Sequence, residues 1–174
     1  YDSNRYSTQA QLLDLGCIVT DIGILPDNEA TITTALKEAG KRHDLLITSG
    51  GVSAGEEDHV KAAVMKQGTV NLWRLAIKPG RPIALGQVGN AAFIGLPGNP
   101  VAAMVTFMVI ARSVILMLSG AMITEAPRYP IKVGFDYAKK LGRKEWVRVR
   151  LKSDDVGGLS AFKIHSGGSG ILTS

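Results

Sequence analysis

The chain has 174 residues, 45% of them hydrophobic, and a formal net charge of +5. These values exclude intrinsic disorder and predict a globular protein with one substantial core and room for a small second one. Aromatic residues are sparse and no basic run is long, so we expect no nucleic-acid partner, and the charge favours small anionic ligands. The single cysteine, Cys17, can form no intrachain disulfide and is predicted to be a small core residue of a cytoplasmic protein.

Neither the start of the chain nor its most apolar segment indicates a membrane partner. Residues 1–5 lack the apolar core of a signal peptide, and the start is typical of a truncated domain. The stretch 101–118 approaches the length of a membrane span, but it contains Arg112 and is interrupted by Thr106 and Ser113. We therefore expect a buried helix there, which could lie at a subunit interface.

Helical and strand patterns alternate with short connections, which predicts an α/β protein with a parallel sheet. Asp2, Ser3 and Asn4 offer N-caps for a first helix, which Gly16 ends. The expected elements that follow are a strand over 17–25, a helix through Ile32, Leu36 and Ala39 that ends at Gly40, a strand over 45–48 and a helix over 58–66.

Strands joined by short turns dominate the next part of the chain. The expected elements are strands over 71–77, 83–86 and 91–96, a turn over 87–90, and a long helix that begins at Pro100. Pro127 and Pro130 bracket a linker, so we place a domain boundary near residue 123. We expect a half-buried strand with one basic face over 146–152 and another strand over 161–165. So few strands do not close a stable β domain, which predicts that this domain is truncated.

Three loops rich in glycine and proline, over 49–58, 78–82 and 96–100, each follow an apolar run typical of a buried strand. Because the carboxyl ends of parallel strands meet at one edge of a sheet, we expect the three loops to lie close together there. Glycine lets backbone N–H groups approach an anion, and Lys78 and Arg81 add positive charge. The loops therefore predict a site for a phosphorylated or oxyanionic small molecule.

The first loop has two explanations. Gly50 and Gly51, flanked by Ser49 and Ser53, lie between a strand and a helix, where backbone N–H groups and the helix dipole can form a phosphate-binding nest. The same glycines are also typical of a tight turn. A Walker lysine is missing, and neither glycine loop matches a dinucleotide-binding fingerprint.

Acidic residues close the first loop. Glu56, Glu57 and Asp58 could stabilise the first turn of the following helix, as carboxylates commonly do. Beside an anion-binding nest, however, carboxylates would repel a phosphate unless a cation lies between them. This argument predicts Mg²⁺ held between Asp58 and the ligand, and the residues alone leave both explanations open.

Prolines and a glycine surround Lys78 and Arg81 in the second loop, and this stiffness favours directing both cations at one oxyanion. Two solvated cations on a stiff connection are the alternative. The third loop contains Pro97, Gly98, Asn99 and Pro100, which suit a binding role at the same edge or a simple turn before a helix. Asp27 follows the expected strand over 17–25 and would lie at that edge too, although an aspartate after proline is most often a turn or cap residue.

Taken in order and spacing, the segments 49–58, 78–82 and 95–100 resemble the three successive signatures of the MoeA-type molybdopterin molybdenumtransferases, the family that includes the gephyrin E domain. Related molybdopterin adenylyltransferases share the fold and the Ser-Gly-Gly element, so the loop over 97–100 decides for the MoeA type. The start at 2–4 and the segment 25–27 are also similar to the family. The resemblance thus covers essentially the whole chain.

The resemblance implies a fold and a reaction. It implies an α/β three-layer sandwich with a mostly parallel sheet over 1–123, lacking its first strand, followed over 124–174 by the start of a β-rich, barrel-like domain. The implied reaction inserts molybdate into adenylylated molybdopterin and releases AMP, with Mg²⁺ as cofactor. Family members are homodimers whose cleft the partner subunit completes, and a molybdopterin adenylyltransferase is the implied upstream partner.

The resemblance also implies residue roles. The implied catalytic residues are Asp58, which would also hold Mg²⁺, Asp27 and Lys78. The implied molybdopterin and phosphate contacts are Ser49, Gly50, Gly51, Ser53, Pro97, Gly98, Asn99 and Pro100. The implied molybdate contacts are Lys78, Arg81 and Arg148, and Arg143 and Arg150 are further candidates, although a solvated strand face explains each of these strand arginines equally well.

Departures from the family limit what the chain could do alone. The two additional domains and the threonine-glycine-aspartate-glutamate motif of the family are missing before Tyr1, so we expect this chain to be inactive by itself. Ala102 stands where many relatives have serine, which removes one potential oxyanion contact. The alternatives are a molybdopterin adenylyltransferase, a nucleotide hydrolase of the competence-damage type, which would lack the 78–81 loop, and a non-catalytic scaffold module of the gephyrin E type.

Overall fold

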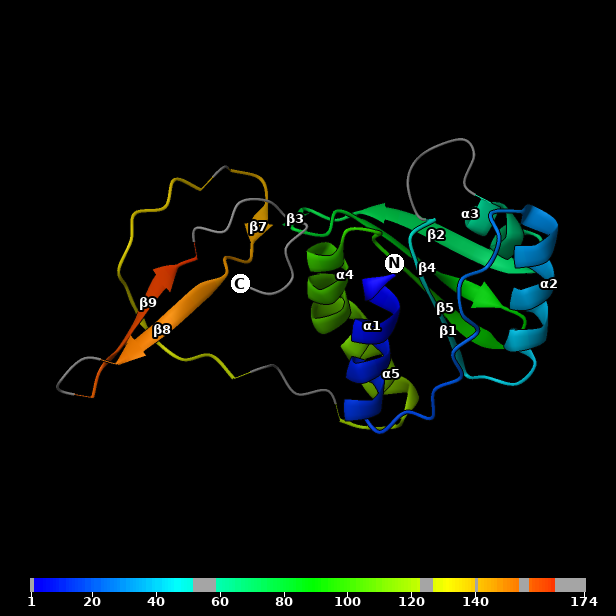
Figure 1. The fold of residues 1–174 in the computed structure, drawn as a ribbon, viewed down its shortest axis with the longest axis horizontal. Helices are drawn as coiled ribbons and strands as arrows, with labels where there is room; N and C mark the ends of the chain where they lie inside the picture. Colours follow the sequence, from blue (N-terminus) through cyan, green and yellow to red (C-terminus); the bar gives the residue numbers. More distant parts are fainter. Residues whose placement is uncertain (1, 52–58, 123–126, 140, 154–156, 165–174) are drawn as a thin grey trace.

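The computed structural model describes residues 2–51, 59–122, 127–139, 141–153 and 157–164. It has two parts (Figure 1). The larger part is a sheet with helices on both faces, and the smaller part, formed by the segment after residue 126, is made of short strands. The expected α/β class followed by a β-rich segment is therefore confirmed.

Three helices form in the first third of the described chain, and their caps explain where they begin. The helices are α1 (Ser3–Asp14), α2 (Glu29–Gly40) and α3 (His59–Met65). The carboxylate of Asp2 accepts a hydrogen bond from the N–H of Arg5 at 3.2 Å, and the side chain of Asn28 accepts one from the N–H of Thr31 at 3.1 Å. Each bond satisfies a donor that the first turn leaves free, so both predicted helices are confirmed.

The main sheet contains four strands in the order β1-β5-β4-β2. Its strands are β1 (Leu45–Ser49), β2 (Gly68–Arg74), β4 (Pro82–Val88) and β5 (Ala91–Leu96). β1 and β5 are parallel, whereas β4 is antiparallel to both β5 and β2. The sheet is therefore more mixed than the expected mostly parallel one, because the short turn at Gly89 and Asn90 forces β4 and β5 to run in opposite directions.

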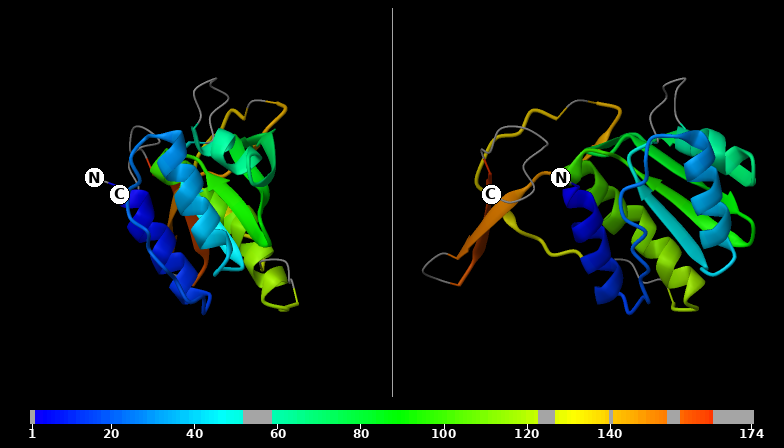
Figure 2. Two further views of the ribbon diagram at one scale, coloured as in Figure 1. Left: turned by 90° about the vertical axis from the view of Figure 1, so that its right-hand side faces the viewer. Right: turned by 45° about the vertical axis from the view of Figure 1, so that its right-hand side comes forward.

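Helices cover both faces of this sheet, as Figures 1 and 2 show. On one face, α2 and α3 bury Leu36 and Val64 against Phe93 of β5. On the other face, the helix that follows β5 buries Phe107 and Ile115 against the sheet, and α1 packs beside it. Two separate core clusters on either side of one sheet confirm the expected three-layer arrangement.

The long apolar helix is built from three segments. They are α4 (Pro100–Thr106), a π-helical segment η1 (Phe107–Ala111) and α5 (Arg112–Leu118). The stretch is long and apolar enough to cross a membrane by length and composition alone, but 44% of it is buried inside the structure. Core helices pass the same test, and its buried face belongs to the second core cluster, as expected for a buried helix.

The predicted strand over Cys17 to Leu25 is wrong. This segment forms no strand, and Ile18 is 97% exposed. An extended segment becomes a strand only when a neighbouring strand supplies hydrogen bonds, and among the described residues β1 pairs with β5 alone. Cys17 itself is half-buried and packs against the second core cluster, so its prediction as a small core residue is confirmed.

The smaller part contains a three-stranded sheet of β6 (Lys132–Val133), β9 (Leu159–Lys163) and β8 (Val149–Ser153). A separate pair joins β3 (Ile77–Lys78) to β7 (Lys144–Glu145). The half-buried strand predicted over 146–152 differs from the structure in two ways. The observed strand, β8, begins at Val149, and all its residues are exposed. The strand predicted over 161–165 corresponds to β9, although His165 lies outside the described residues.

Candidate functional site

The described start of the first loop, residues 49–51, lies beside the third loop. β1 and β5 are parallel and in register, with Ser49 opposite Leu96, so the two loops leave the sheet at the same edge. The N–H of Gly50 donates a hydrogen bond to the carbonyl of Leu96 at 3.0 Å. Gly98 is so close that a Cβ added there would lie 3.7 Å from the Cα of Gly50. The structure therefore brings the described parts of these two predicted loops together, and Pro97 is buried.

Asn4 links these two loops, and the sequence predicted for it only a capping role. It lies in the first turn of α1 and is 5% exposed. Its amide nitrogen Nδ2 donates hydrogen bonds to Ser49 Oγ at 2.7 Å and to the carbonyl of Gly98 at 2.8 Å. One buried side chain thus fixes the distance between the two loops. A buried amide facing a glycine loop is visible only once the fold places them together.

The second loop reaches the same end of the sheet because β4 runs antiparallel to β5 and so begins where β5 ends. Gly80 has a φ of 99°, and a Cβ there would collide with Oγ1 of Thr106 and lie 3.3 Å from the carbonyl of Ala102. The loop is therefore pressed against α4, the helix that starts at the third loop. The described start of the first loop, residues 49–51, lies with the second and third loops along the upper edge of the α/β part in Figure 1, as predicted.

Lys78 has a partner that the sequence did not predict. Its Nζ lies 3.9 Å from Oε1 of Glu145, whose side chain is 5% exposed, whereas that of Lys78 is 58% exposed. The hydroxyl of Tyr137 donates a hydrogen bond to the other carboxylate oxygen, Oε2. That hydrogen bond lowers the pKa of the Glu145 carboxyl below its ordinary value, and the positive charge of Lys78 adds to the effect, whereas burial opposes it.

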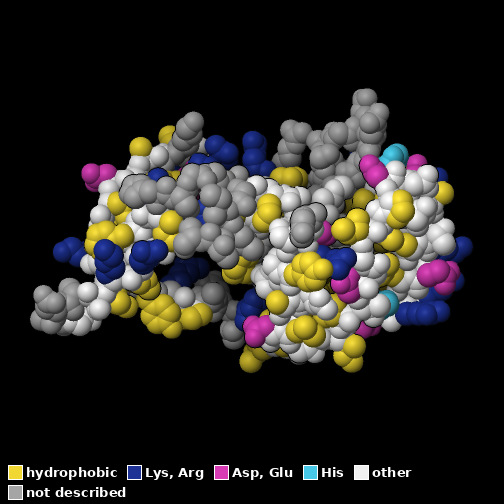
Figure 3. Space-filling model, viewed as in Figure 1, with side chains coloured by type: hydrophobic (Ala, Val, Ile, Leu, Met, Phe, Trp, Pro, Cys, Tyr) yellow, Lys and Arg dark blue, Asp and Glu magenta, His cyan; other side chains and the backbone are white. Residues whose placement is uncertain are grey.

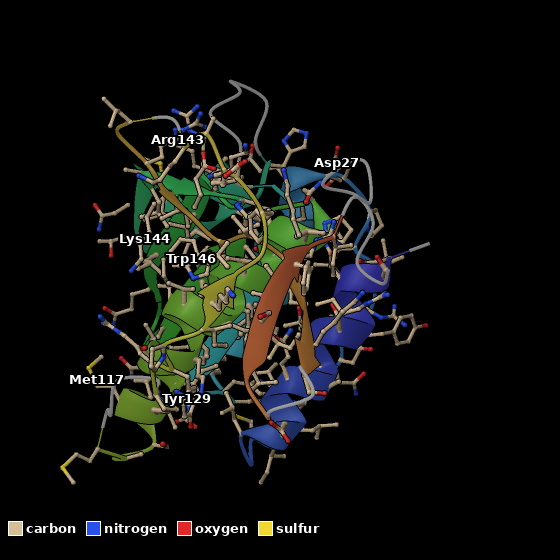
Figure 4. The ribbon with its side chains drawn as sticks, turned by 90° about the vertical axis from the view of Figure 1, so that its left-hand side faces the viewer. Asp27, Met117, Tyr129, Arg143, Lys144 and Trp146 are labelled. Atoms are coloured by element: carbon tan, nitrogen blue, oxygen red, sulfur yellow. The ribbon has the colours of Figure 1, made fainter. Side chains whose placement is uncertain are left out.

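The remaining basic candidates come from two places. Arg81 is exposed on the second loop, and its carbonyl accepts a hydrogen bond from the N–H of Leu75 at 2.7 Å. Arg143 and Arg148 are half-buried in the smaller part, whereas Arg150 is exposed on β8. Figure 4 shows Arg143 toward the upper end of the molecule.

Asp27 lies at the same end of the molecule in Figure 4, beside the start of α2. It is exposed and precedes Asn28, the residue that caps this helix. Ser53 and Asp58 lie outside the described residues, so neither the predicted serine contact nor the predicted Mg²⁺ ligand is placed. Within the described ranges, no group of three or more His, Cys, Asp or Glu side chains could hold a metal ion. The described residues therefore do not form a metal site by themselves.

Two family descriptions match the chain. Residues 1–116 match the family described as "Probable molybdopterin binding domain". Residues 130–174 match the description "MoeA C-terminal region (domain IV)". The first match contains all three loops and Asn4, and the second contains Glu145 and Tyr137. The site geometry described above therefore combines residues from both matched regions.

Relatives with known names agree with these descriptions. A molybdopterin molybdenumtransferase of Haemophilus influenzae is 40% identical over 175 residues, which are 100% of this chain and 43% of that protein. A gephyrin of Dictyostelium discoideum is 33% identical over 115 residues, which are 57% of this chain and 16% of that protein. The chain thus spans less than half the length of these relatives.

Solved structures show the same fold. A molybdenum cofactor biosynthesis protein from Pyrococcus furiosus has a TM-score of 0.69 and 27% identity, over 98% of this chain and 54% of that one. A molybdopterin biosynthesis MoeA protein from Pyrococcus horikoshii has a TM-score of 0.71 at 20% identity, over 96% of this chain and 40% of that one, which supports the fold alone. Together with the three loop signatures, these matches establish that the chain belongs to the MoeA family of molybdopterin molybdenumtransferases.

Proposed function

We propose that the protein containing this chain inserts molybdate into adenylylated molybdopterin, releasing AMP, as a step in molybdenum cofactor biosynthesis. One observation carries the proposal. Asn4 holds the first and third loops side by side, at the end of the sheet where the second loop, which contains Lys78, also lies. Such an edge suits two anions, because stiff loops place backbone donors and cations before the ligand arrives.

Each loop has a proposed task. Backbone N–H groups of Gly51 and Gly98 would bind the phosphates of the pterin substrate, since glycine allows close approach. Gly50, whose N–H is bonded to the carbonyl of Leu96, would line the same turn, and the φ values of Gly50 and Gly51 are both positive. Lys78 and Arg81 would bind molybdate as charge-assisted donors, and Arg148 would add a contact from the smaller part. Ser49, Ser53, Pro97, Asn99 and Pro100 would complete the lining.

Mg²⁺ dependence is a separate part of the proposal and depends on Asp58, a residue outside the described part. Mg²⁺ is commonly held by one or two carboxylates together with substrate phosphates, and Asp27 would be the second carboxylate at this edge. When bound, the ion would neutralise charge on the phosphates and so assist departure of AMP.

Further features are proposed from the family. The intact protein would act as a homodimer in the cytoplasm, with a molybdopterin adenylyltransferase as the enzyme that supplies its substrate. The α/β domain would end near residue 123 and would take its first strand from a preceding segment. The chain taken alone would be inactive, since it spans 43% of the Haemophilus relative.

The test uses the intact protein with adenylylated molybdopterin and molybdate. We expect calorimetric binding of both and release of AMP, with Asp58→Asn and Lys78→Ala each reducing kcat/KM by about 100-fold or more. Glu38→Gln is the matched control, because Glu38 of α2 forms an exposed ion pair with Lys41, the residue that follows this helix, away from the loops. Normal turnover by Asp58→Asn would remove that residue from the mechanism.

The same experiment separates the alternatives. Binding of both substrates without AMP release would favour a non-catalytic module of the gephyrin type, and failure to bind either would reject the transferase proposal. Formation of adenylylated molybdopterin from ATP would indicate an adenylyltransferase. The match of residues 130–174 to the MoeA C-terminal region already disfavours a competence-damage hydrolase, whose resemblance concerns the α/β domain alone.

A further inference from the structure

The second loop is joined to the smaller part of the molecule by main-chain hydrogen bonds. β3 and β7 run parallel, with Lys78 opposite Glu145. The N–H of Lys144 donates to the carbonyl of Ala76 at 2.8 Å, and the N–H of Trp146 donates to the carbonyl of Lys78 at 3.0 Å. These main-chain bonds do not involve the Glu145 carboxylate, so a change of its side chain to glutamine removes none of them.

The Glu145 carboxylate is unusual for so short a strand because its side chain is 5% exposed. A buried carboxylate requires partners, and this one has a hydrogen bond from Tyr137 on one oxygen and Lys78 Nζ at 3.9 Å from the other. The aromatic ring of Tyr137 packs edge-on against Phe135, with ring centroids 6.3 Å apart. The carboxylate is therefore fixed on one side and faces an ammonium group on the other.

The two partners of this ion pair differ in freedom. Glu145 is buried and held by Tyr137, whereas Lys78 is a long side chain that is 58% exposed. The position of the fixed carboxylate therefore determines where the flexible ammonium group lies. An ammonium group has three N–H donors, so orientation of one toward Glu145 leaves two for an anion at the loop edge.

We infer that Glu145 is a positioning residue: its carboxylate holds the ammonium group of Lys78 at the loop edge, ready to bind molybdate. The inference rests on the proposed role of Lys78 in molybdate binding. Glu145 would touch neither substrate and would act only through Lys78. This positioning role would also explain why the smaller part contributes an acidic residue opposite Lys78, although most of the charged residues of the smaller part are basic.

The first test needs no turnover. In the intact protein, side-chain NMR of the Lys78 methylene next to Nζ, assigned through Lys78→Arg, would report its mobility. We expect restricted motion in the unmodified protein and solvent-like motion in Glu145→Gln, while Glu145→Asp keeps part of the restriction. Lys37, an exposed lysine of α2, is the internal control. Equal mobility of Lys78 with and without the carboxylate would overturn the inference.

The second test is a double-mutant cycle on molybdate use. Glu145→Gln should raise the KM for molybdate about tenfold with little change in kcat, and Glu145→Asp should recover part of the loss. In a Lys78→Ala background, the same substitution should change KM less than about twofold, because the group it positions is gone. Equal effects in both backgrounds would show that Glu145 acts without Lys78 and would reject the inference.

Controls distinguish this inference from folding and from the proposed function. Glutamine has the shape of glutamate and can still accept from Tyr137, so thermal unfolding should change little, and Glu38→Gln should alter neither KM nor Lys78 mobility. If the unmodified protein neither binds nor uses molybdate, the proposed function fails, whereas the mobility experiment still decides whether Glu145 holds Lys78. Tyr137→Phe should shift KM in the same direction by a smaller factor.

Discussion

The two parts of the molecule divide burial and charge between them. Residues 1–123 contain ten basic and ten acidic residues, whereas residues 124–174 contain ten basic and five acidic ones, so the second part carries all of the net charge of +5. Figure 3 shows Lys and Arg side chains gathered over the smaller part. Among the described residues, the buried hydrophobic side chains lie in the first part, with the exception of Ala161.

This difference indicates how the site is built. Burial of apolar surface holds the first part in one arrangement, so it can present loops at fixed positions. The second part has little buried surface of its own and supplies charge at the loop edge through the β3–β7 pair. Backbone donors and the loop cations Lys78 and Arg81 thus come from the neutral part, and the basic part places Glu145 beside Lys78.

The largest expected effect comes from disturbing the packed part. Gly80→Ala should destabilise the intact protein by about 3 kcal/mol, because the new Cβ meets Thr106 and a φ of 99° is strained for any residue with a Cβ. Gly16→Ala is the control, since Gly16 has a φ of 77° with nothing within 4 Å of the added Cβ. That substitution should cost about 1 kcal/mol. Denaturant unfolding measures both, and equal losses would contradict the packing of the second loop on α4.

A smaller loss should follow from separating the two glycine loops. Asn4→Asp removes the N–H donor to the Gly98 carbonyl and places a carboxylate oxygen against that carbonyl oxygen. The free energy of unfolding should fall by about 2 kcal/mol, because neither oxygen can donate. Calorimetry should also show weaker binding of the pterin substrate, because the loops are no longer held at one distance. Gln9→Glu makes the same change at a half-buried position of the same helix and should cost less than about 0.5 kcal/mol. Similar losses at both positions would remove Asn4 from the site.

The contact between the two parts should depend on pH. The lowered pKa of Glu145 means that its contribution is complete above the ordinary value of 4.5 and is lost as pH falls through the lower folded value. Tyr137, whose pKa is raised above 10.0 by the hydrogen bond to Glu145, loses its contribution only as pH rises through that higher value. Lys78, Arg143 and Lys139 are the cations near this carboxylate. The contact should therefore be strongest between these limits.

NMR can follow this contact through the amides of Lys144 and Trp146, which donate across the β3–β7 pair. We expect their chemical shifts to be constant over the neutral range and to move together in acid. In Tyr137→Phe the acid transition should move to higher pH, because the largest cause of the lowered pKa is gone. An unchanged midpoint would show that Tyr137 does not set the pKa of Glu145.

The smallest expected effect lies at the edge of the packed part. Ile18 is 97% exposed, so Ile18→Ser should change the free energy of unfolding by less than about 0.5 kcal/mol. In the intact protein, a loss near 2 kcal/mol would instead indicate that a further segment covers this residue, as the proposed first strand would. Thermal unfolding of both forms of the intact protein distinguishes the two outcomes.

Local chemistry explains what could be predicted from the sequence. The caps at Asp2 and Asn28 are properties of single residues and their neighbours, and the structure confirms the helices that they begin. The first and third loops could be placed at one edge because glycine, proline and a preceding apolar run together specify where the parallel strands β1 and β5 end. The second loop lies there for a different reason, since it precedes β4, which begins where β5 ends. Their order along the chain was also sufficient to indicate the family, which the comparisons confirm.

Only the tertiary structure could decide features that depend on a distant partner. The segment 17–25 has the apolar pattern of a strand, but strand formation requires a neighbour, and the local sequence contains no information on that neighbour. The same holds for Asn4, which is a cap by its position and a bridge between two loops only after folding. The partner of Lys78 is 67 residues away on β7, so pairing of β3 with β7 had to bring Glu145 to it. The sequence by itself thus determined the chemistry available at the loop edge, and long-range packing decided which groups hold it in place.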